Sequence, residues 1–253
     1  MKKLTVHQII TILVTVLTIT LNILANALPF NGQGTGEISD RFDILFVPAG
    51  YVFAIWFFIY VGLIAFTVFQ AKPSQADNPL LRKIAPAYWI ANMANNIWLF
   101  LWHWNQFPLT LLAMITILIS LLYLYMQFMK NPQPLTKAEK WLVKLPFSVY
   151  LGWISVATIA NVSQVLFFAN WSGFGISATI WTVIMVLVAT IIGILMLVRE
   201  RNMSYALVLV WSFIGIAAKQ SGNALIANTA YLGTGLLLII GLLIGFRLIK
   251  KGK

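Results

Sequence analysis

The chain contains a stretch of 24 residues, 47–70, without a charged side chain, and this stretch constrains the fold most. About 20 apolar residues cross the hydrocarbon layer of a membrane as an α-helix at 1.5 Å per residue. The stretch therefore predicts a membrane-spanning helix. Within it, Phe53, Trp56 and Tyr60 follow the spacing i, i+3, i+7 and share one helical face. Such an aromatic face predicts either packing against other helices or the lining of a pocket for a flat apolar molecule.

The composition extends the membrane prediction to the whole chain. Of 253 residues 60% are hydrophobic and 9% are charged, whereas about a quarter of the residues in a soluble domain are charged. The absence of cysteine excludes disulfides, a thiolate nucleophile and a cysteine metal site, and two histidines are too few for a histidine cluster. All six acidic residues are predicted in loops or at helix ends. We therefore expect no catalytic site, no metal site and no enzymatic activity.

Apolar runs separated by polar connections predict an all-α fold, a polytopic membrane helix bundle with about eight transmembrane helices. The predicted spans cover about residues 8–28, 47–71, 84–103, 107–129, 145–168, 176–198, 204–218 and 225–249. The third is the most polar, and the seventh holds only about 15 apolar residues, fewer than the ~20 of a typical span.

The basic residues predict how these spans are oriented. With eight spans, every Lys and Arg except Arg41 and Lys219 falls on one side of the membrane. Loops on the cytoplasmic side carry the excess of basic residues, so we expect a multi-pass protein of the cell membrane with both termini in the cytoplasm. Because the net charge of +11 arises from residues that flank apolar spans, we expect no nucleic-acid partner.

Two predicted spans place amides and tryptophans together. In the third, Asn92 and Asn96 share a face with Asn95 close by, and an amide in hydrocarbon must find a partner. Interhelical hydrogen bonding and the polar lining of a cavity are equally good interpretations. The fifth span carries an aromatic pair, a small residue and an amide at i, i+3, i+7 and i+11: Tyr150, Trp153, Ala157 and Asn161. Packing alone explains each stripe, but the two together favour a shared pocket.

Two further residues have a structural and a functional interpretation. His103 lies between Trp102 and Trp104, where interfacial aromatics collect, and is predicted as an interface anchor, with a proton-linked or haem-iron ligand role as the alternative. Lys219 begins a Lys-Gln-Ser-Gly-Asn run that predicts an exposed loop. A Schiff-base lysine is the weaker interpretation, because no carboxylate is predicted inside the membrane.

Three motifs resemble the signatures of spans two, three and five of the TspO family, the tryptophan-rich sensory proteins related to the mitochondrial translocator protein. The motifs are Pro48-x-x-Tyr51-x-Phe53-x-x-Trp56-x-x-x-Tyr60-x-Gly62, Asn95-x-x-Trp98 and Tyr150-Leu151-Gly152-Trp153-x-x-x-Ala157-x-x-x-Asn161. Their order and spacing agree with that family over about residues 8–170. The last three predicted spans have no counterpart in its five-helix members.

The resemblance implies a TspO-like five-helix bundle over residues 1–170, followed at 171–253 by three additional transmembrane helices and a basic tail. It implies a pocket for a porphyrin or another flat apolar molecule, and it requires no cofactor beyond such a tetrapyrrole ligand. By matching position, the ligand-binding residues are Phe53, Trp56, Asn95, Trp98, Trp153, Ala157 and Asn161.

The leading hypothesis is therefore a membrane protein that binds a flat hydrophobic ligand for sensing or transport. A secondary transporter of a small solute and a structural or partner-binding subunit are the alternatives. The expected partners are a hydrophobic small molecule and membrane lipid, with a homodimer as a further option.

Overall fold

The structure is a computed structural model that describes residues 3–251. These residues form helices and connections without any strand, which confirms the all-α prediction. The chain forms two compact units: the first comprises residues 1–42 and 56–154, and the second comprises 43–55 and 155–253. This division follows packing, whereas the boundary predicted at residue 170 follows the family resemblance and stays a prediction.

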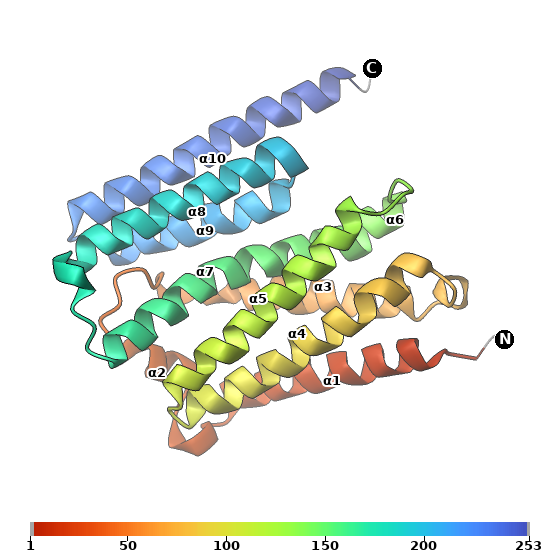
Figure 1. The fold of residues 1–253 in the computed structure, drawn as a ribbon, viewed down its shortest axis with the longest axis horizontal. Coiled ribbons are helices and arrows are strands. Elements are labelled where there is room, and N and C mark those ends of the chain that lie inside the picture. The colour runs from red at the N-terminus through yellow and green to blue at the C-terminus, as the bar shows by residue number, and fades with distance from the viewer. Residues whose placement is uncertain (1–2, 252–253) are drawn as a thin grey trace. The chain divides into compact units, whose positions relative to one another are not determined.

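In the first unit, the long helices lie side by side. α1 packs on α4, and α4 packs on α5 (Figure 1). Its complete elements are α1 Val6–Ala27, η1 Phe30–Gly32, α2 Thr35–Asp40, η3 Pro73–Gln75, α4 Pro79–His103, α5 Phe107–Met129, α6 Lys137–Glu139 and a π-helical turn Lys140–Lys144. Two helices belong to this unit only in part: α3 Ile55–Gln70 from residue 56 onward, and α7 Leu145–Phe168 up to residue 154. The motif residue Gly62 lets α3 approach α7, because a Cβ there would lie 2.9 Å from Cβ of Pro146.

In the second unit, three helices pack pairwise on one another (Figure 1). Its elements are η2 Gly50–Ala54, the rest of α7, η5 Gly173–Gly175, α8 Ala178–Glu200, α9 Met203–Lys219 and α10 Ala224–Lys251. Gly193 of α8 makes the close packing feasible. A Cβ at this position would lie 2.7 Å from Leu209 of α9 and 2.8 Å from Leu237 of α10.

Six helical segments in the described part of the chain are long and apolar enough to cross a membrane. They are Val6–Ala27, Gly50–Gln70, Phe107–Met129, Lys137–Phe168, Ala178–Glu200 and Ala224–Arg247. The predicted third and seventh spans form α4 and α9 but are not among these six. α4 carries three asparagines, and α9 has 17 residues, so the predicted count of eight is not confirmed.

The predicted helix at 47–71 begins later than expected. Residues Gly50–Ala54 form a 3₁₀ turn, and α3 starts only at Ile55. The reason is tertiary: the indole N–H of Trp211 donates to the carbonyl of Val52 at 3.0 Å, and the amide of Ala49 donates to the carbonyl of Gly215 at 3.1 Å.

Helix α1 turns its polar side chains inward and its apolar side chains outward. Leu13 is 62% exposed and Val16 59%, as expected for side chains that face lipid. The buried stripe, which we call the α1 polar seam, consists of Gln8, Thr11, Thr15, Thr18 and Asn22. Its hydrogen bonds reach α3 and α4: Thr15 Oγ1 bonds the Tyr88 hydroxyl at 2.6 Å and Thr67 Oγ1 at 2.8 Å. Such bonds hold membrane helices together where no hydrophobic driving force acts between them.

A buried carboxylate outside the apolar part of the helices ties α6 to the start of α4. Glu139 accepts hydrogen bonds from the backbone and hydroxyl of Thr136, both at 2.8 Å, and from the amide of Asn78 at 3.0 Å. Asn78 in turn caps α4 by accepting from Leu80 and Leu81. Burial acts to raise the pKa of the Glu139 carboxyl, but these hydrogen bonds outweigh burial and hold the pKa below its usual value.

We expect Glu139→Gln to lower the free energy of unfolding by about 1 kcal/mol at neutral pH, because glutamine can keep an oxygen toward Thr136 but then turns its own amide donor toward the amide of Asn78. Since the folded-state pKa lies below the unfolded one, the carboxylate stabilises at neutral pH, and this stabilisation is lost as the pH falls through the folded-state pKa. Thermal unfolding in detergent at about pH 7 and about pH 3 should show the difference between the variant and the parent protein shrinking in acid.

Asp77→Asn is the control for this comparison. Asp77 pairs with Arg82 at 2.6 Å, but both side chains are largely exposed, and such pairs contribute about 0–1 kcal/mol. Equal unfolding temperatures of Glu139→Gln and the parent protein at neutral pH would show that the capping carboxylate does not stabilise the fold.

Candidate functional site

The first unit contains a cluster of four aromatic rings from α3 and α7. Trp56 stacks on Tyr60, with ring centroids 5.5 Å apart at 24°. It meets Tyr150 at 5.9 Å and Trp153 at 6.4 Å in edge-to-face geometry. Tyr150 and Trp153 are buried, whereas Trp56 is only half-buried. We call these four residues the aromatic cluster; it offers indole surface that is fixed in place by neighbouring rings.

On α4, Asn95 is oriented by an amide of the α1 polar seam. The side-chain nitrogen of Asn22 donates both to the carbonyl of Thr18 and to Oδ1 of Asn95, each at 2.9 Å. The carbonyl of Thr18 can only accept a hydrogen bond, so the Asn22 atom that contacts it must be the amide nitrogen. Because this nitrogen donates, the Asn95 atom that faces it must be the oxygen. The amide nitrogen of Asn95 is left as a donor.

The other two asparagines of α4 differ from each other. Asn92 donates to the carbonyl of Tyr88 at 2.8 Å. Neither amide atom of Asn96 has a hydrogen-bond partner within residues 3–251, although the residue is buried, with only 5% of its surface exposed. The buried hydroxyl of Tyr150 also lacks a hydrogen-bond partner within these residues. Buried polar groups are normally hydrogen-bonded, so such exceptions call for an explanation. Interhelical bonding therefore accounts for Asn95, whereas the interpretation of Asn96 as a polar cavity lining stays a prediction.

Trp98, one turn from Asn95 on α4, belongs to a different aromatic group. Its ring stacks on Trp102 with centroids 4.9 Å apart at 21°. It packs against a buried apolar cluster that comprises Ile38, Trp102 and Phe107. In this arrangement Trp98 contributes to the packing of α2 and α5 against the end of α4.

The seven predicted ligand-binding residues are divided between the two units. The first unit holds Trp56, Asn95, Trp98 and Trp153, and the second holds Phe53, Ala157 and Asn161. The structure brings Trp56 and Trp153 into contact, whereas Asn95 contacts Asn22 and Trp98 contacts Trp102. In the second unit, Phe53 is exposed on η2, Ala157 is half-buried, and Asn161 is buried beside Gln164 on α7. The assignment of these residues to a ligand stays a prediction.

The structure shows the surroundings of His103 and Lys219, the two residues for which the sequence left two interpretations. His103 is fully buried, its Nδ1 bonds the carbonyl of Leu99 at 2.8 Å, and its Nε2 bonds the hydroxyl of Thr35 at 3.1 Å. With both ring nitrogens engaged, His103 anchors the connection that contains α2 and is not placed as an iron ligand. Lys219 is exposed in the last turn of α9. Among the described residues no group of three or more acidic or histidine side chains could hold a metal ion.

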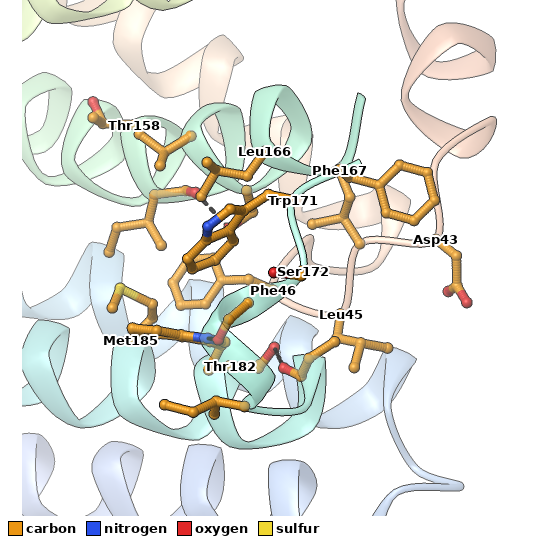
Figure 2. A pocket seen from close by; sticks show the side chains of 18 residues that line it. Asp43, Leu45, Phe46, Thr158, Leu166, Phe167, Trp171, Ser172, Thr182 and Met185 are labelled. Atoms are coloured by element: carbon orange, nitrogen blue, oxygen red, sulfur yellow. Dashed lines mark hydrogen bonds between the residues drawn. The ribbon is translucent and has the colours of Figure 1, made fainter. Parts of the chain in front are cut away.

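Sequence reasoning missed a pocket in the second unit. It has a volume of about 420 Å³ and is lined by residues of the segment before η2, of α7 and of α8 (Figure 2). Two tryptophans form part of its wall: Trp171 and Trp181 have ring centroids 5.4 Å apart at 47°. None of the predicted ligand-binding residues lines it. The available signal was the run Trp171-Ser-Gly-Phe-Gly, an aromatic residue in a glycine-rich turn.

Together, the lipid-facing apolar side chains, the inward polar seam and six helical segments of spanning length define a polytopic α-helical membrane protein. A family model described as TSPO-like protein matches residues 8–243. The chain therefore belongs to the TSPO-like family, as the motifs predicted. The match continues beyond the range 8–170 of the motifs and includes α8, α9 and most of α10. Comparisons with curated proteins and with solved structures gave no match.

Proposed function

We propose that this TSPO-like membrane protein binds a flat hydrophobic ligand of the tetrapyrrole class inside the membrane, for sensing or transport and without catalysis. The observation that carries the proposal is the aromatic cluster. Trp153 and Tyr150 hold the ring of Trp56 edge-on, and the half-buried ring of Trp56 offers a face for stacking. A macrocycle gains most from such a rigid aromatic surface, because little side-chain freedom is lost on binding.

The polar groups of α4 suit the periphery of such a ligand. The amide nitrogen of Asn95, oriented by Asn22, is a donor for a propionate or a carbonyl. Asn96 supplies a second buried amide without a protein partner among the described residues. The family pattern adds Trp98 to the proposed ligand-binding residues of the first unit, while the assignment of Phe53, Ala157 and Asn161 to a ligand stays a prediction.

We further propose that all eight predicted spans cross the membrane, with both termini in the cytoplasm. α4 packs along α1 and α5, and α9 packs along α8 and α10. Each of the two therefore lies between two helices of spanning length. These neighbours can shield the asparagines of α4 from lipid and can accommodate α9, which is short for a span. The basic residues then lie on the cytoplasmic side, apart from Arg41 and Lys219.

Titration of the purified protein in detergent with protoporphyrin IX tests the proposal through quenching of tryptophan fluorescence. We expect saturable binding, and we expect Trp56→Phe to weaken it by about fivefold, because one aromatic contact contributes about 1 kcal/mol. Trp141→Phe is the matched control: this indole is 62% exposed on the π-helical turn, outside the aromatic cluster.

Quenching that does not saturate, or that is equal in both variants, would mean that the porphyrin only partitions into the micelle. The proposed ligand site would then be wrong. Uptake assays in proteoliposomes and a search for a bound protein partner would follow, since a small-solute transporter and a partner-binding subunit are the alternatives.

A further inference from the structure

The pocket of the second unit lies outside the proposed tetrapyrrole site and uses none of its residues. Its wall comes from Leu45 and Phe46 before η2, from the C-terminal half of α7, from the turn at 170–175 and from the start of α8 (Figure 2). A volume of about 420 Å³ falls within the ~300–1,000 Å³ of small-molecule sites. All lining residues belong to one compact unit.

The turn that shapes this pocket has a costly backbone conformation. Asn170 has φ 53° and Phe174 has φ 54°, and Gly173 and Gly175 between and after them are also positive. A positive φ is unfavourable for a bulky residue such as phenylalanine. The conformation lets the carbonyl of Gly173 accept the indole N–H of Trp181 at 2.9 Å. It also places Trp171 against both Phe174 and Trp181. Strain of this kind is often held at functional sites.

Most polar groups of the wall are already satisfied by backbone carbonyls. Ser163 Oγ donates to Ile159, Thr182 Oγ1 donates to Ala178, and the indole of Trp181 donates to Gly173. The indole N–H of Trp171 is different, since it donates to no group within the described chain. Figure 2 shows the Trp171 ring turned toward Phe46 and Met185. The pocket therefore offers one indole donor among apolar and aromatic surfaces.

The pocket offers no cation to a ligand. Neither Lys, Arg nor His lines it. The carboxylate of Asp43 lies at the edge, is exposed, and points away from the lining rings in Figure 2. An anionic ligand such as a porphyrin carboxylate would find no cation here.

We propose that this pocket binds a second small molecule, a neutral ring-containing apolar compound whose hydrogen-bond acceptor takes the N–H of Trp171. The indoles of Trp171 and Trp181 and the ring of Phe46 favour a flat π-system, and the sulfur of Met185 adds a favourable contact with aromatic rings. A lipid acyl chain has no acceptor for the indole and no ring to stack. The proposal is independent of the tetrapyrrole site.

Photolabelling with benzophenone tests the proposal, because this neutral probe has two rings and one carbonyl acceptor. The protein in detergent is irradiated over a range of benzophenone concentrations, and adducts at Met185 are quantified by mass spectrometry. Met129, which is exposed on α5, reports partition into the micelle in the same sample. We expect saturable labelling at Met185 and labelling at Met129 that rises linearly.

Trp171→Phe should raise the half-saturating concentration at Met185 by about fivefold, because the variant loses one hydrogen bond while it keeps an aromatic side chain. Ser163→Leu, which places a larger side chain on the pocket wall and leaves the Trp171 indole in place, should abolish the saturable component even if Trp171→Phe unfolds. Trp56→Phe should leave labelling unchanged, which separates this site from the tetrapyrrole site.

Three results would overturn the proposal. Labelling at Met185 that rises linearly would show partition alone. Unchanged half-saturation in a folded Trp171→Phe variant would show that the indole donor takes no part. Complete protection by hexadecane at equal concentration would assign the pocket to acyl chains.

Discussion

Replacing Gly233 by leucine is expected to lower the free energy of unfolding by about 3 kcal/mol, the upper end of the range for overpacking. Gly233 lies on α10 where this helix meets α8 and α9. A Cβ there would lie 2.6 Å from Thr190 Oγ1 and 3.1 Å from the ring of Phe213. Neither neighbour can yield easily, because Thr190 Oγ1 donates to the carbonyl of Val186 and Phe213 is fully buried.

Gly235→Leu provides a matched control on the same helix. A Cβ at Gly235 would meet no atom within 4 Å, and leucine has a higher helix propensity than glycine by roughly 0.8 kcal/mol. We therefore expect the unfolding temperature in detergent to be unchanged or raised for Gly235→Leu. It should fall by about 6–12 °C for Gly233→Leu, at 2–4 °C per kcal/mol for a chain of this size.

Equal behaviour of the two glycine variants would contradict the packing of α8, α9 and α10. It would mean that α10 does not approach α8 and α9 closely at Gly233. A selective effect at Gly233 would support a tightly packed second unit, within the range that matches the TSPO-like family.

Sequence reasoning located the long helices because spanning a membrane requires about 20 apolar residues, a local property. It also placed Trp56 and Trp153 on neighbouring helices, through motif spacing and family resemblance. It could not find the 3₁₀ turn Gly50–Ala54, because the cause is a hydrogen bond to Val52 from Trp211, which is distant in sequence. Local propensity does not contain such a tertiary bond.

The candidate pocket of the second unit was hidden for a related reason. Trp171 and Trp181 lie ten residues apart, and only the left-handed conformations of Asn170 and Phe174 bring their rings together. Glycines in the run after Trp171 indicate a turn, but positive φ values at Asn170 and Phe174 are set by the surrounding structure. The pattern therefore predicted a connection and not a cavity.

The α1 polar seam was also visible only in part. The first span reads as apolar, and its threonines do not break that pattern. In a membrane bundle, however, the polar stripe faces the protein and the apolar surface faces lipid, opposite to a soluble helix. Thr11, Thr15 and Thr18 thus mark the inward face of α1, and Asn22 extends the same face to Asn95.

Replacing Thr15 by valine should lower the free energy of unfolding by about 1.5 kcal/mol, since two buried interhelical hydrogen bonds are lost without a change of volume. Thr15 Oγ1 donates to the carbonyl of Thr11 at 2.7 Å. With its proton used there, it accepts from the hydroxyls of Tyr88 and Thr67. Valine offers no acceptor, and the buried hydroxyl of Tyr88 loses its closest partner.

A double-mutant cycle with Tyr88→Phe separates the hydrogen bond from other effects of the substitution. The single variants each leave a polar partner behind, whereas the double variant removes both groups, so its loss should be smaller than the sum by about 1 kcal/mol. Thr20→Val is the control, because Thr20 is exposed on the lipid-facing side of α1 and should tolerate valine. Strict additivity would mean that Thr15 and Tyr88 are not coupled, and that another feature holds α1 to α4. A coupling between Thr15 and Tyr88 would establish that a polar contact holds α1 to α4, and Asn22 of the same seam then links α1 to the orientation of Asn95.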